Sequence, residues 1–318
     1  SSALLHHMLR GVGVNAALAG NIGDPALLAP KDADAIVLEM SSYQIADLVH
    51  APDRFVFLNL SNDHAPWHRG IDRYRSDKCR LARLNPNIPG VMNAADPRLF
   101  ELFGHQPNRF WFGREEDGFH ARDGAVFYKA ERWGPIEALP GGHNALNACA
   151  GLTLLHSLGL DARKAFDSLT DFAGLPHRLQ TVHETGGVVF VDDGLATTPE
   201  ACVHAVSAYP GRPVALLLGG EEREQDYAWL AEKLDAFDNL AAIICLKDNG
   251  ERVRDALKSG RHGPIVHLIP DIEPATDAAF RAVKGDGVVL LSPAAPRSSG
   301  YASFAERGAA FTEAAKSL

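Results

Sequence analysis

The chain has 318 residues, of which 46% are hydrophobic and 22% charged, and its net charge at pH 7 is −9. This balance is typical of a globular protein with one large domain or two ordinary ones. The acidic charge argues against binding to nucleic acid or to an anionic membrane surface, both of which require a basic footprint. No apolar run approaches the roughly 20 residues of a membrane-spanning helix. We therefore expect a cytoplasmic protein, acting as a monomer on small molecules.

The first predicted element is an amphipathic helix over residues 2–12. Its apolar residues recur at helical spacing on one face, and these are Leu4, Leu5, Met8 and Leu9. A domain rarely begins inside such a helix without a lead-in, so we expect a segment that precedes this sequence to be missing from it. The four cysteines are far apart and fit no zinc-binding spacing, which favours free thiols in a reducing compartment.

Short apolar runs alternate with helical patterns through the first half of the chain. We expect strands at residues 35–39, 54–60, 89–93, 108–112 and 124–129, and helices at residues 71–84 and 143–158. Such alternation is typical of βαβ units around a parallel sheet.

The pattern restarts after Gly174 and predicts a second α/β domain. Its expected strands are residues 187–191, 213–218, 240–246, 264–268 and 287–291, with helices between them and from residue 302 onward. This order is that of a doubly wound sheet with helices on both faces. The Gly- and Pro-containing segment GLPHRL is the natural hinge. We therefore predict one domain over residues 1–174 and another over residues 175–318.

Two neighbouring strands of the first half end in polar residues. Glu39 ends the strand at 35–39, and the next strand runs into Asp63 and His64. Ligands of open α/β sheets bind beyond the carboxyl ends of the strands, where a carboxylate is well placed to hold Mg²⁺. A solvent-facing strand end or a structural histidine is the alternative for each residue taken alone.

Two helices carry further candidates. Lys78 lies among arginines on the helix at 71–84, where composition alone favours a solvated basic face over a functional role. Asn144 and Asn147 fall on the first turns of the helix that follows GGHNALNA. Asn144 is either a helix cap or, with Asn147 one turn later, a contact for a nucleotide base or ribose. The residues alone leave both alternatives open.

Two loops of the second half follow predicted strands and open helices. In VDDGLATTPEA, Thr198 is expected to cap a helix that begins at Pro199. Capping is compatible with functional roles for Asp192, Asp193 and Thr197 in the same loop. In LSPAAPRSSGYASF, candidate contacts for a carboxylate or phosphate are Ser292, Arg297, Ser298 and Ser299.

Taken in order, these segments resemble the Mur ligase family, which builds the peptide stem of bacterial peptidoglycan. The motifs are GNIGDP, LEMSSYQ, NLSNDH, RYRSDK, GGHNALNA, GLPHRL, DDGLATTPEA and LSPAAP with a later F..RG. Each is weak alone, but the eight occur in the family's order along the whole chain. The ending LSPA...F..RG is similar to that of the glutamate-adding branch.

The resemblance implies three domains: one for the UDP part of the substrate, a P-loop-type ATPase domain and a Rossmann-like domain for the amino acid. The first is absent from this sequence, and the second lacks its start. No GxxxxGK[ST] phosphate loop occurs in the 318 residues. We therefore expect these residues alone to bind ATP poorly and not to turn over. If the native gene also lacks the loop, a non-catalytic ligand-binding module becomes the favoured interpretation.

The chemistry implied by the resemblance is carboxylate activation. ATP phosphorylates the carboxylate of UDP-N-acetylmuramoyl-L-alanine, and the amino group of glutamate attacks the acyl phosphate. The Mg²⁺ ligands implied are Glu39, His64 and Lys78, the last as a carbamate. The residues implied to contact ATP are Asn144, Asn147, Arg178 and Asp193. Those implied to contact the substrates are Asn21, Ser41, Leu195, Thr197, Ser292 and Arg297.

Three positions depart from the pattern of D-glutamate-adding relatives. Those relatives have Lys where this chain has Leu195, Ser where it has Arg297, and usually Ser where it has Gly194. A branch that adds L-glutamate is similar to this chain in its apolar residue at 195 and in the Thr-Thr-Pro that follows. We therefore favour L-glutamate as the substrate. The alternatives are a D-glutamate-adding ligase and a family member with another amino acid or acceptor.

Overall fold

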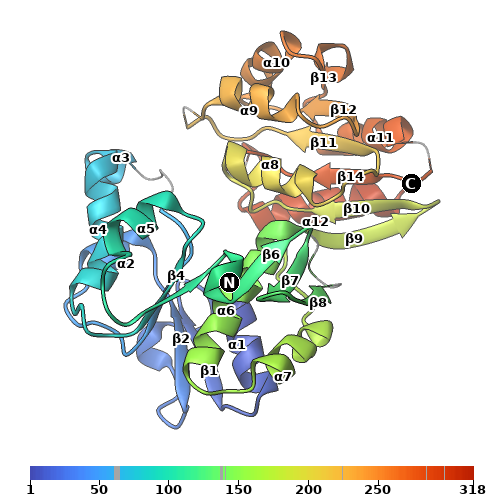
Figure 1. Cartoon of the computed structure of the whole chain (residues 1–318). Coiled ribbons are helices and arrows are strands. Elements are labelled where there is room, and N and C mark those ends of the chain that lie inside the picture. Colours follow the sequence, from blue (N-terminus) through green and yellow to red (C-terminus); the bar gives the residue numbers. More distant parts are fainter. Residues whose placement is uncertain (61–64, 137–138, 140, 224, 284, 297) are drawn as a thin grey trace. The chain divides into compact units, whose positions relative to one another are not determined.

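The computed structural model describes residues 1–60, 65–136, 139, 141–223, 225–283, 285–296 and 298–318. The chain divides into two compact units, Ser1–Ala173 and Gly174–Leu318 (Figure 1). Within the described residues, no helix has both the length and the apolar character needed to cross a membrane.

The strands of unit 1 form three small sheets. β1 (Ala16–Gly20) pairs in parallel with β2 (Ala35–Glu39), so that Gly20 lies opposite Glu39. A second parallel sheet contains β3 (Phe55–Phe57), β4 (Gly90–Asn93) and β5 (Arg109–Phe112). The third sheet is antiparallel and consists of β6 (Phe119–Arg122), β7 (Ala125–Tyr128) and β8 (Glu131–Pro135).

Helices of unit 1 pack on both faces of the sheet β3–β4–β5. The apolar helix α6 (Gly142–Ser157) lies at the centre of one core with α1 (Ser2–Gly11), α7 (Ala162–Asp167) and the inner faces of β1, β2, β6 and β7. α4 (Ile71–Arg83) and α5 (Pro97–Phe103) form the other core with β3 and β4. Two short helices, α2 (Ser42–Ala46) and α3 (Ala65–His68), pack beside α4.

Unit 2 contains one six-stranded sheet in the order β13-β12-β11-β14-β10-β9. The five parallel strands are β10 (Val188–Asp192), β11 (Val214–Leu218), β12 (Leu240–Cys245), β13 (Val266–Leu268) and β14 (Val288–Leu291). β9 (Gln180–Thr185) joins the edge in antiparallel orientation. The last strand, β14, is inserted between β10 and β11, so the order of the strands reverses here. Ligands of doubly wound sheets bind at such a switch point, beyond the carboxyl ends of the strands.

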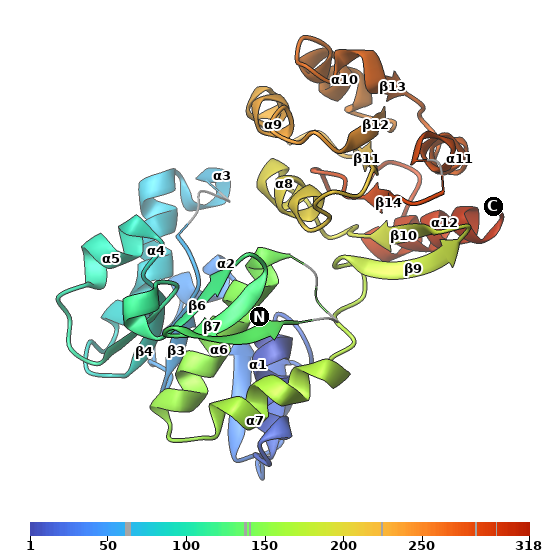
Figure 2. The ribbon, with the colours of Figure 1, turned by 45° about the vertical axis from the view of Figure 1, so that its right-hand side comes forward.

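Each face of the unit 2 sheet is covered by its own set of helices (Figure 2). α8 (Pro199–Ser207), α9 (Tyr227–Leu234) and α10 (Gly250–Lys258) bury their apolar residues against one face. α11 (Ile272–Val283) and α12 (Phe304–Lys316) pack on the other. β11 is buried along its whole length, as expected of a strand covered on both sides.

The predicted α/β class is confirmed, as are the predicted strands and helices, with small shifts at their ends. The strand predicted at 124–129 is β7, which belongs to the antiparallel sheet rather than to a parallel one. The strand expected over 54–60 is shorter and stops at Phe57. Four strands were not predicted from the sequence. β1 is rich in Ala and Gly, whereas β6, β8 and β9 are short segments in which polar and apolar residues are mixed. All four cysteines are free and buried.

Candidate functional site

Glu39 and Asn21 meet at the carboxyl edge of the sheet β1–β2. The amide Nδ2 of Asn21 donates to Oε1 of Glu39 over 3.2 Å, and the backbone N of Asn21 donates to the carbonyl of Glu39 over 2.9 Å. Gly20 precedes Asn21 with φ of +106°, and a Cβ there would lie 2.2 Å from the Glu39 carbonyl. Glycine is therefore required for this close approach of the two strand ends.

A pocket opens beside this pair. It is lined by Gly20, Gly23, Pro25, Ala26, Leu27, Leu38, Glu39, Met40 and Gln44. The lining includes the half-buried Glu39 and the almost fully exposed Leu27. The pocket lies where a doubly wound sheet binds ligands, at the carboxyl ends of strands.

Ser41 begins α2 through a capping box. Its hydroxyl accepts from the backbone N of Gln44 over 3.3 Å, and the Gln44 side chain accepts from the backbone N of Ser41 over 2.8 Å. This reciprocal pair satisfies two backbone donors at the helix start. The Ser41 hydroxyl is therefore fixed two residues after Glu39, in a segment that leads directly away from β2.

Behind Ser41 lies a buried hydrogen-bonded network of Ser42, His68 and Asp77. The imidazole Nε2 of His68 is 3.0 Å from Ser42 Oγ, and its Nδ1 is 2.8 Å from Asp77 Oδ2. All three residues are buried, and Asp77 also pairs with Arg73. The network joins α2, α3 and α4 and fixes the backbone next to Ser41 and next to Lys78. Ser42 is too buried for the access that a nucleophilic serine needs, so the network is described as a structural link between the three helices.

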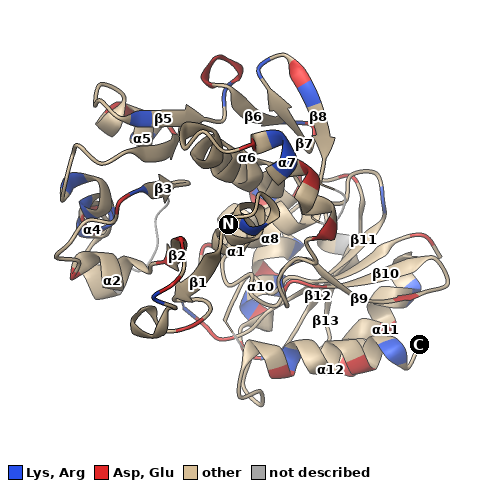
Figure 3. Ribbon diagram, turned by 90° about the horizontal axis from the view of Figure 1, so that it is seen from below, with Lys and Arg blue, Asp and Glu red and all other residues tan. Residues whose placement is uncertain are grey.

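Lys78 projects from α4, one of the helices that carry basic residues (blue in Figure 3). It is half-buried, and its Nζ lies 6.0 Å from the centre of the Tyr74 ring. A lysine held over an aromatic ring is less free than one on a solvated basic face. His64, the second predicted metal ligand on this edge, lies outside the described residues.

Among the described residues, Glu39 offers the type of oxygen donor that Mg²⁺ binds. No group of three His, Cys, Asp or Glu side chains within them gathers closely enough to form a metal cage. Mg²⁺ rarely uses such cages in phosphate-handling sites, where one or two carboxylates and phosphate oxygens suffice. Glu39, at a strand end and on the wall of a pocket, is a donor of the right type.

Asn144 and Asn147 lie on the first turns of α6. The helix is capped at Gly141, without a side-chain hydrogen bond, so Asn144 is not its N-terminal cap. Asn147 Oδ1 accepts from the hydroxyl of Ser1 over 2.9 Å. Both asparagines are half-buried, which leaves part of each side chain open to solvent.

Asp193, among the described residues of unit 2, is an acid whose pKa is strongly raised. It follows β10, is 9% exposed, and accepts hydrogen bonds from Ser292 Oγ (2.8 Å) and the backbone N of Leu179 (3.2 Å). Burial raises the pKa of this carboxyl to about 7, although both hydrogen bonds and nearby Arg178 oppose the rise. Perturbed acids gather at functional sites, which makes Asp193 a strong candidate.

The neighbouring Asp192 holds the loop that follows. Its Oδ2 is 2.7 Å from His177 Nδ1, and its Oδ1 accepts from the backbone N of Gly194 over 2.8 Å. A Cβ at Gly308 would lie 2.2 Å from the Asp192 carboxylate, so α12 packs directly on this group. The backbone N of Leu195 in turn donates to the His177 carbonyl over 3.2 Å.

The segment GLPHRL carries backbone strain. His177 and Leu179 have φ of 60° and 47°, in the left-handed region that non-glycine residues rarely adopt. Hydrogen bonds hold both of them: one links the His177 carbonyl to Leu195, and another links the Leu179 amide to Asp193. Strain that persists under such constraint is typical of functional sites.

The other predicted contacts of unit 2 lie around the same loop. Leu195 is half-buried and Thr197 is exposed, whereas Thr198 caps α8 and Pro199 begins it, as predicted. Arg178 is exposed and close enough to Asp193 to lower its pKa. Arg297 lies outside the described residues.

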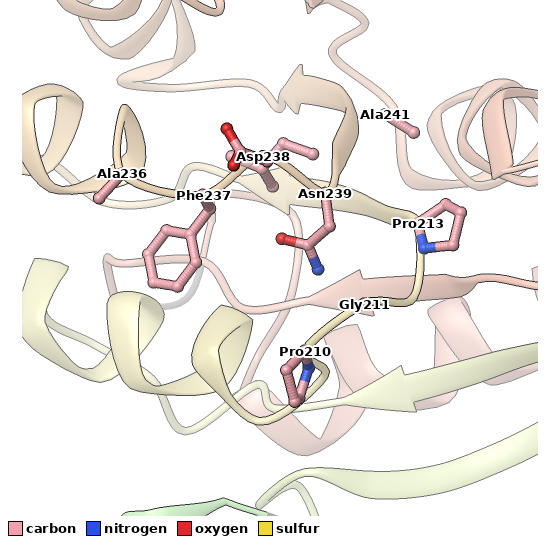
Figure 4. A pocket seen from close by; sticks show the side chains of 9 residues that line it. Pro210, Gly211, Pro213, Ala236, Phe237, Asp238, Asn239 and Ala241 are labelled. Carbon is pink, nitrogen blue, oxygen red and sulfur yellow. The ribbon is translucent and has the colours of Figure 1, made fainter.

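A second pocket lies at the opposite edge of this sheet (Figure 4). It is lined by Pro210, Gly211, Pro213, Ala236, Phe237, Asp238, Asn239, Leu240 and Ala241. Both polar side chains are already used: Asn239 donates to the carbonyls of Tyr209 and Arg212, and Asp238 pairs with Arg261. This pocket therefore offers no chemistry comparable to that around Asp193.

Two family models match the chain. The Mur ligase middle domain matches residues 4–155, and the Mur ligase glutamate ligase domain matches residues 177–295. A UDP-N-acetylmuramoyl-L-alanine–L-glutamate ligase of a Micromonospora species is 37% identical over 99% of this chain and 71% of its own length. The ligase of the same name from Xanthomonas oryzae is 38% identical over 99% of this chain and 69% of its own length.

The chain belongs to the Mur ligase family. The resemblance found in the ordered motifs is thereby confirmed. Solved structures support the fold: the MurF ligase of Thermotoga maritima in complex with ADP superposes with a TM-score of 0.73 at 20% identity, covering 99% of this chain and 77% of its own. The folylpolyglutamate synthase of Mycobacterium tuberculosis gives 0.67 at 13% identity, covering 98% of this chain and 88% of its own.

Sequence reasoning did not predict the Ser42–His68–Asp77 network or the pairing of Asp192 with His177, and it assigned no role to Arg307, although that residue lies in the quoted F..RG motif. The first joins residues that lie 9 and 26 positions apart, and no local periodicity marks such contacts. Asp77 carried a weak signal, because a polar residue on the inner face of an amphipathic helix such as α4 requires a partner.

Proposed function

We propose that this Mur-family chain performs the ATP-dependent addition of L-glutamate to UDP-N-acetylmuramoyl-L-alanine. The observation that carries the proposal is the identity of 37–38% to ligases named for that reaction, over 99% of this chain. The Asp193 and Glu39 sites, each at the carboxyl edge of a parallel sheet, support it. In this proposal residues 1–174 bind the nucleotide and residues 175–318 bring the amino acid.

In unit 1, Glu39 would hold Mg²⁺, with Asn21 fixing the carboxylate through the 3.2 Å hydrogen bond. When bound, Mg²⁺ neutralises the phosphate oxygens that crowd together as the substrate carboxylate is activated. Lys78 would support the metal as a carbamate, because an ammonium would repel it. His64 would be a further ligand, Ser41 would contact the UDP-linked substrate, and Asn144 and Asn147 would contact the adenine nucleotide.

In unit 2, Asp193 and Arg178 would contact ATP, and the loop after β10 would receive the amino acid. Thr197 and Arg297 are the polar residues proposed for glutamate. Ser292, expected from the sequence to contact a substrate, is completely buried and donates its hydroxyl to Asp193, so its role would be to hold that acid. Leu195 presents no cation there, which favours the L enantiomer over the D enantiomer used by relatives with a lysine. Because leucine cannot pair with a carboxylate, other residues would have to hold the two carboxylates of glutamate.

The deciding experiment measures phosphate release by the complete gene product with ATP, Mg²⁺ and UDP-N-acetylmuramoyl-L-alanine. Parallel reactions contain L-glutamate, D-glutamate or no amino acid. Release that requires L-glutamate supports the proposal, and the Glu39→Gln variant should abolish it. Preference for D-glutamate would retain the family chemistry but overturn the interpretation of Leu195. No release with either enantiomer would overturn the function, and a screen of other amino acids would follow.

A further inference from the structure

Lys247 lies just beyond the end of β12, at the carboxyl edge of the unit 2 sheet. It is half-buried, and its Nζ lies 5.2 Å from the centre of the Tyr301 ring. A Cβ at Gly300, where φ is +89°, would lie 3.0 Å from the same Nζ. The loop that follows β14 therefore passes close to the ammonium at a residue without a side chain.

The next residue, Asp248, fixes this loop. Its carboxylate accepts from the backbone N of Ser299 over 2.6 Å and from the Ser299 hydroxyl over 2.5 Å. Asp248 has φ of +71°, in the left-handed region that non-glycine residues rarely adopt, and strain of this kind gathers at functional sites. The acid beside Lys247 is thus used to hold the loop against the end of β12 and not to neutralise the lysine.

Cations are scarce in the loops that follow the five parallel strands. Within the described parts of these loops they are Arg223 and Lys247. Arg223 pairs with Glu221 over 3.1 Å, and its side chain is 63% exposed. Lys247 has no salt bridge to any described residue. Its ammonium, held beside a ring and a backbone, is therefore the cation of this edge that is left for an anionic ligand.

Glutamate would bring two carboxylates to this unit, which matches the glutamate ligase domain. The proposed contacts for ATP, Asp193 and Arg178, lie next to β10, and the amino group of glutamate must face the carboxylate that ATP activates. β12 is three positions away from β10 in the strand order. A group that follows β12 therefore meets the end of glutamate farthest from the reacting amine, which is the side-chain carboxylate.

We propose that Lys247 binds the side-chain carboxylate of glutamate and thereby selects glutamate over glutamine, its neutral isostere. The ammonium is a compact point charge, and Tyr301 and the Asp248–Ser299 pair keep it in place. A carboxamide carries no negative charge, so its contact with the ammonium is weaker than that of a carboxylate. This inference rests on the proposed function and assigns one of its substrate contacts.

The test compares kcat/KM for L-glutamate with that for L-glutamine, by phosphate release, in the complete gene product and in Lys247→Met. The variant keeps the length of the side chain and removes the charge. We expect kcat/KM for glutamate to fall roughly tenfold or more, as for the loss of a charged hydrogen bond, mainly through a higher KM for glutamate. The value for glutamine should change little, and the KM values for ATP and the UDP-linked substrate should stay constant. Lys247→Arg should keep most of the preference.

Lys316→Met is the matched control, because this exposed lysine lies at the end of α12 and pairs with Glu313. It should change none of these values. A merely structural role of Lys247 would lower the rates with both amino acids by the same factor. An unchanged glutamate/glutamine ratio in Lys247→Met would therefore overturn the proposal, and so would loss of that ratio in Arg223→Met alone.

If Lys247→Met does not fold, Lys247→Gln decides, because it also removes the charge but keeps a polar end. It should lower the glutamate/glutamine ratio in the same direction, and an unchanged ratio would overturn the proposal. Equal use of the two amino acids by the wild-type protein would overturn it as well. Absence of any glutamate-dependent turnover by the wild-type protein would overturn the proposed function itself, and this inference with it.

Discussion

The hydroxyl of Ser292, just after β14, donates a 2.8 Å hydrogen bond to the carboxylate of Asp193, just after β10. The two residues are 99 positions apart in sequence and are both buried. Their contact joins the loops that follow β14 and β10, which are neighbouring strands at the switch point of the unit 2 sheet. It supplies one of the two hydrogen bonds that the Asp193 carboxylate accepts, the other coming from the backbone N of Leu179.

Asp193→Asn should change how stability depends on pH. Burial raises the pKa of the Asp193 carboxyl from 3.8 to about 7, so the folded state favours the protonated form. The stabilising contribution is complete below pH 4 and is lost as pH rises through about 7. The wild-type protein should lose on the order of a few kcal/mol over this window, and Asp193→Asn should lose less. Hydrogen exchange of unit 2 peptides between pH 5 and 8 measures the difference, and equal pH dependence would contradict the assignment.

Ser292→Ala should destabilise unit 2 at pH 8 by roughly 1.5–3 kcal/mol, the usual value of a hydrogen bond to a charged group. Because the Ser292 hydroxyl lowers the pKa of Asp193, its removal should also move the pH dependence upward. Urea unfolding at several pH values measures both effects. Ser259→Ala is the control, since that exposed hydroxyl only contacts the carbonyl of Ala256. A change no greater than the control's would show that the hydroxyl does not support Asp193.

Asp77→Ala should destabilise unit 1 because it leaves the buried Nδ1 of His68 without a partner. The expected cost is roughly 1–3 kcal/mol, that of an unsatisfied buried polar group. Arg73→Ala removes the other partner of Asp77, an arginine whose side chain is 71% exposed, and should cost no more than about 1 kcal/mol. Thermal unfolding of the two variants gives the comparison. Similar losses would show that the exposed ion pair, rather than the buried network, stabilises the packing of α4.

Gly20→Ala should disturb the Glu39 edge more than backbone strain alone explains. Both Gly20 and Gly134 have positive φ, +106° and +125°, but only Gly20 has a neighbour in the way, the Glu39 carbonyl at 2.2 Å. Gly134→Ala should cost about 1–2 kcal/mol from strain, and Gly20→Ala should cost more. Gly20→Ala should also lower phosphate release, whereas Gly134→Ala should not. If the two variants changed stability and phosphate release equally, Gly20 would have no special role at the Glu39 edge.

The elements of this fold could be predicted wherever burial imposes a regular pattern. β11 and β14 are buried on both faces, and their unbroken apolar runs were recognised. β9 pairs along one edge only and is half-exposed, so its mixed sequence resembles a loop. The site was predictable to the extent that it lies at strand ends, as Glu39 and Asp193 do. The contact of His68 with Asp77 depends on how α3 packs against α4, and the periodicity of the sequence does not indicate such packing.

Leu195→Lys should move the enantiomer preference towards D-glutamate. Leu195 is half-buried, and its backbone is fixed by the hydrogen bond to the His177 carbonyl, so a lysine there would enter the loop without moving it. A cation at this position would offer a glutamate carboxylate a contact that leucine cannot make. We expect kcat/KM for D-glutamate to rise and that for L-glutamate to fall, each by roughly tenfold for about 1.4 kcal/mol of altered binding. Leu158→Lys, at an exposed leucine of unit 1, controls for the added charge. An unchanged preference in Leu195→Lys would show that this side chain does not face glutamate and that the loop discriminates through its backbone alone.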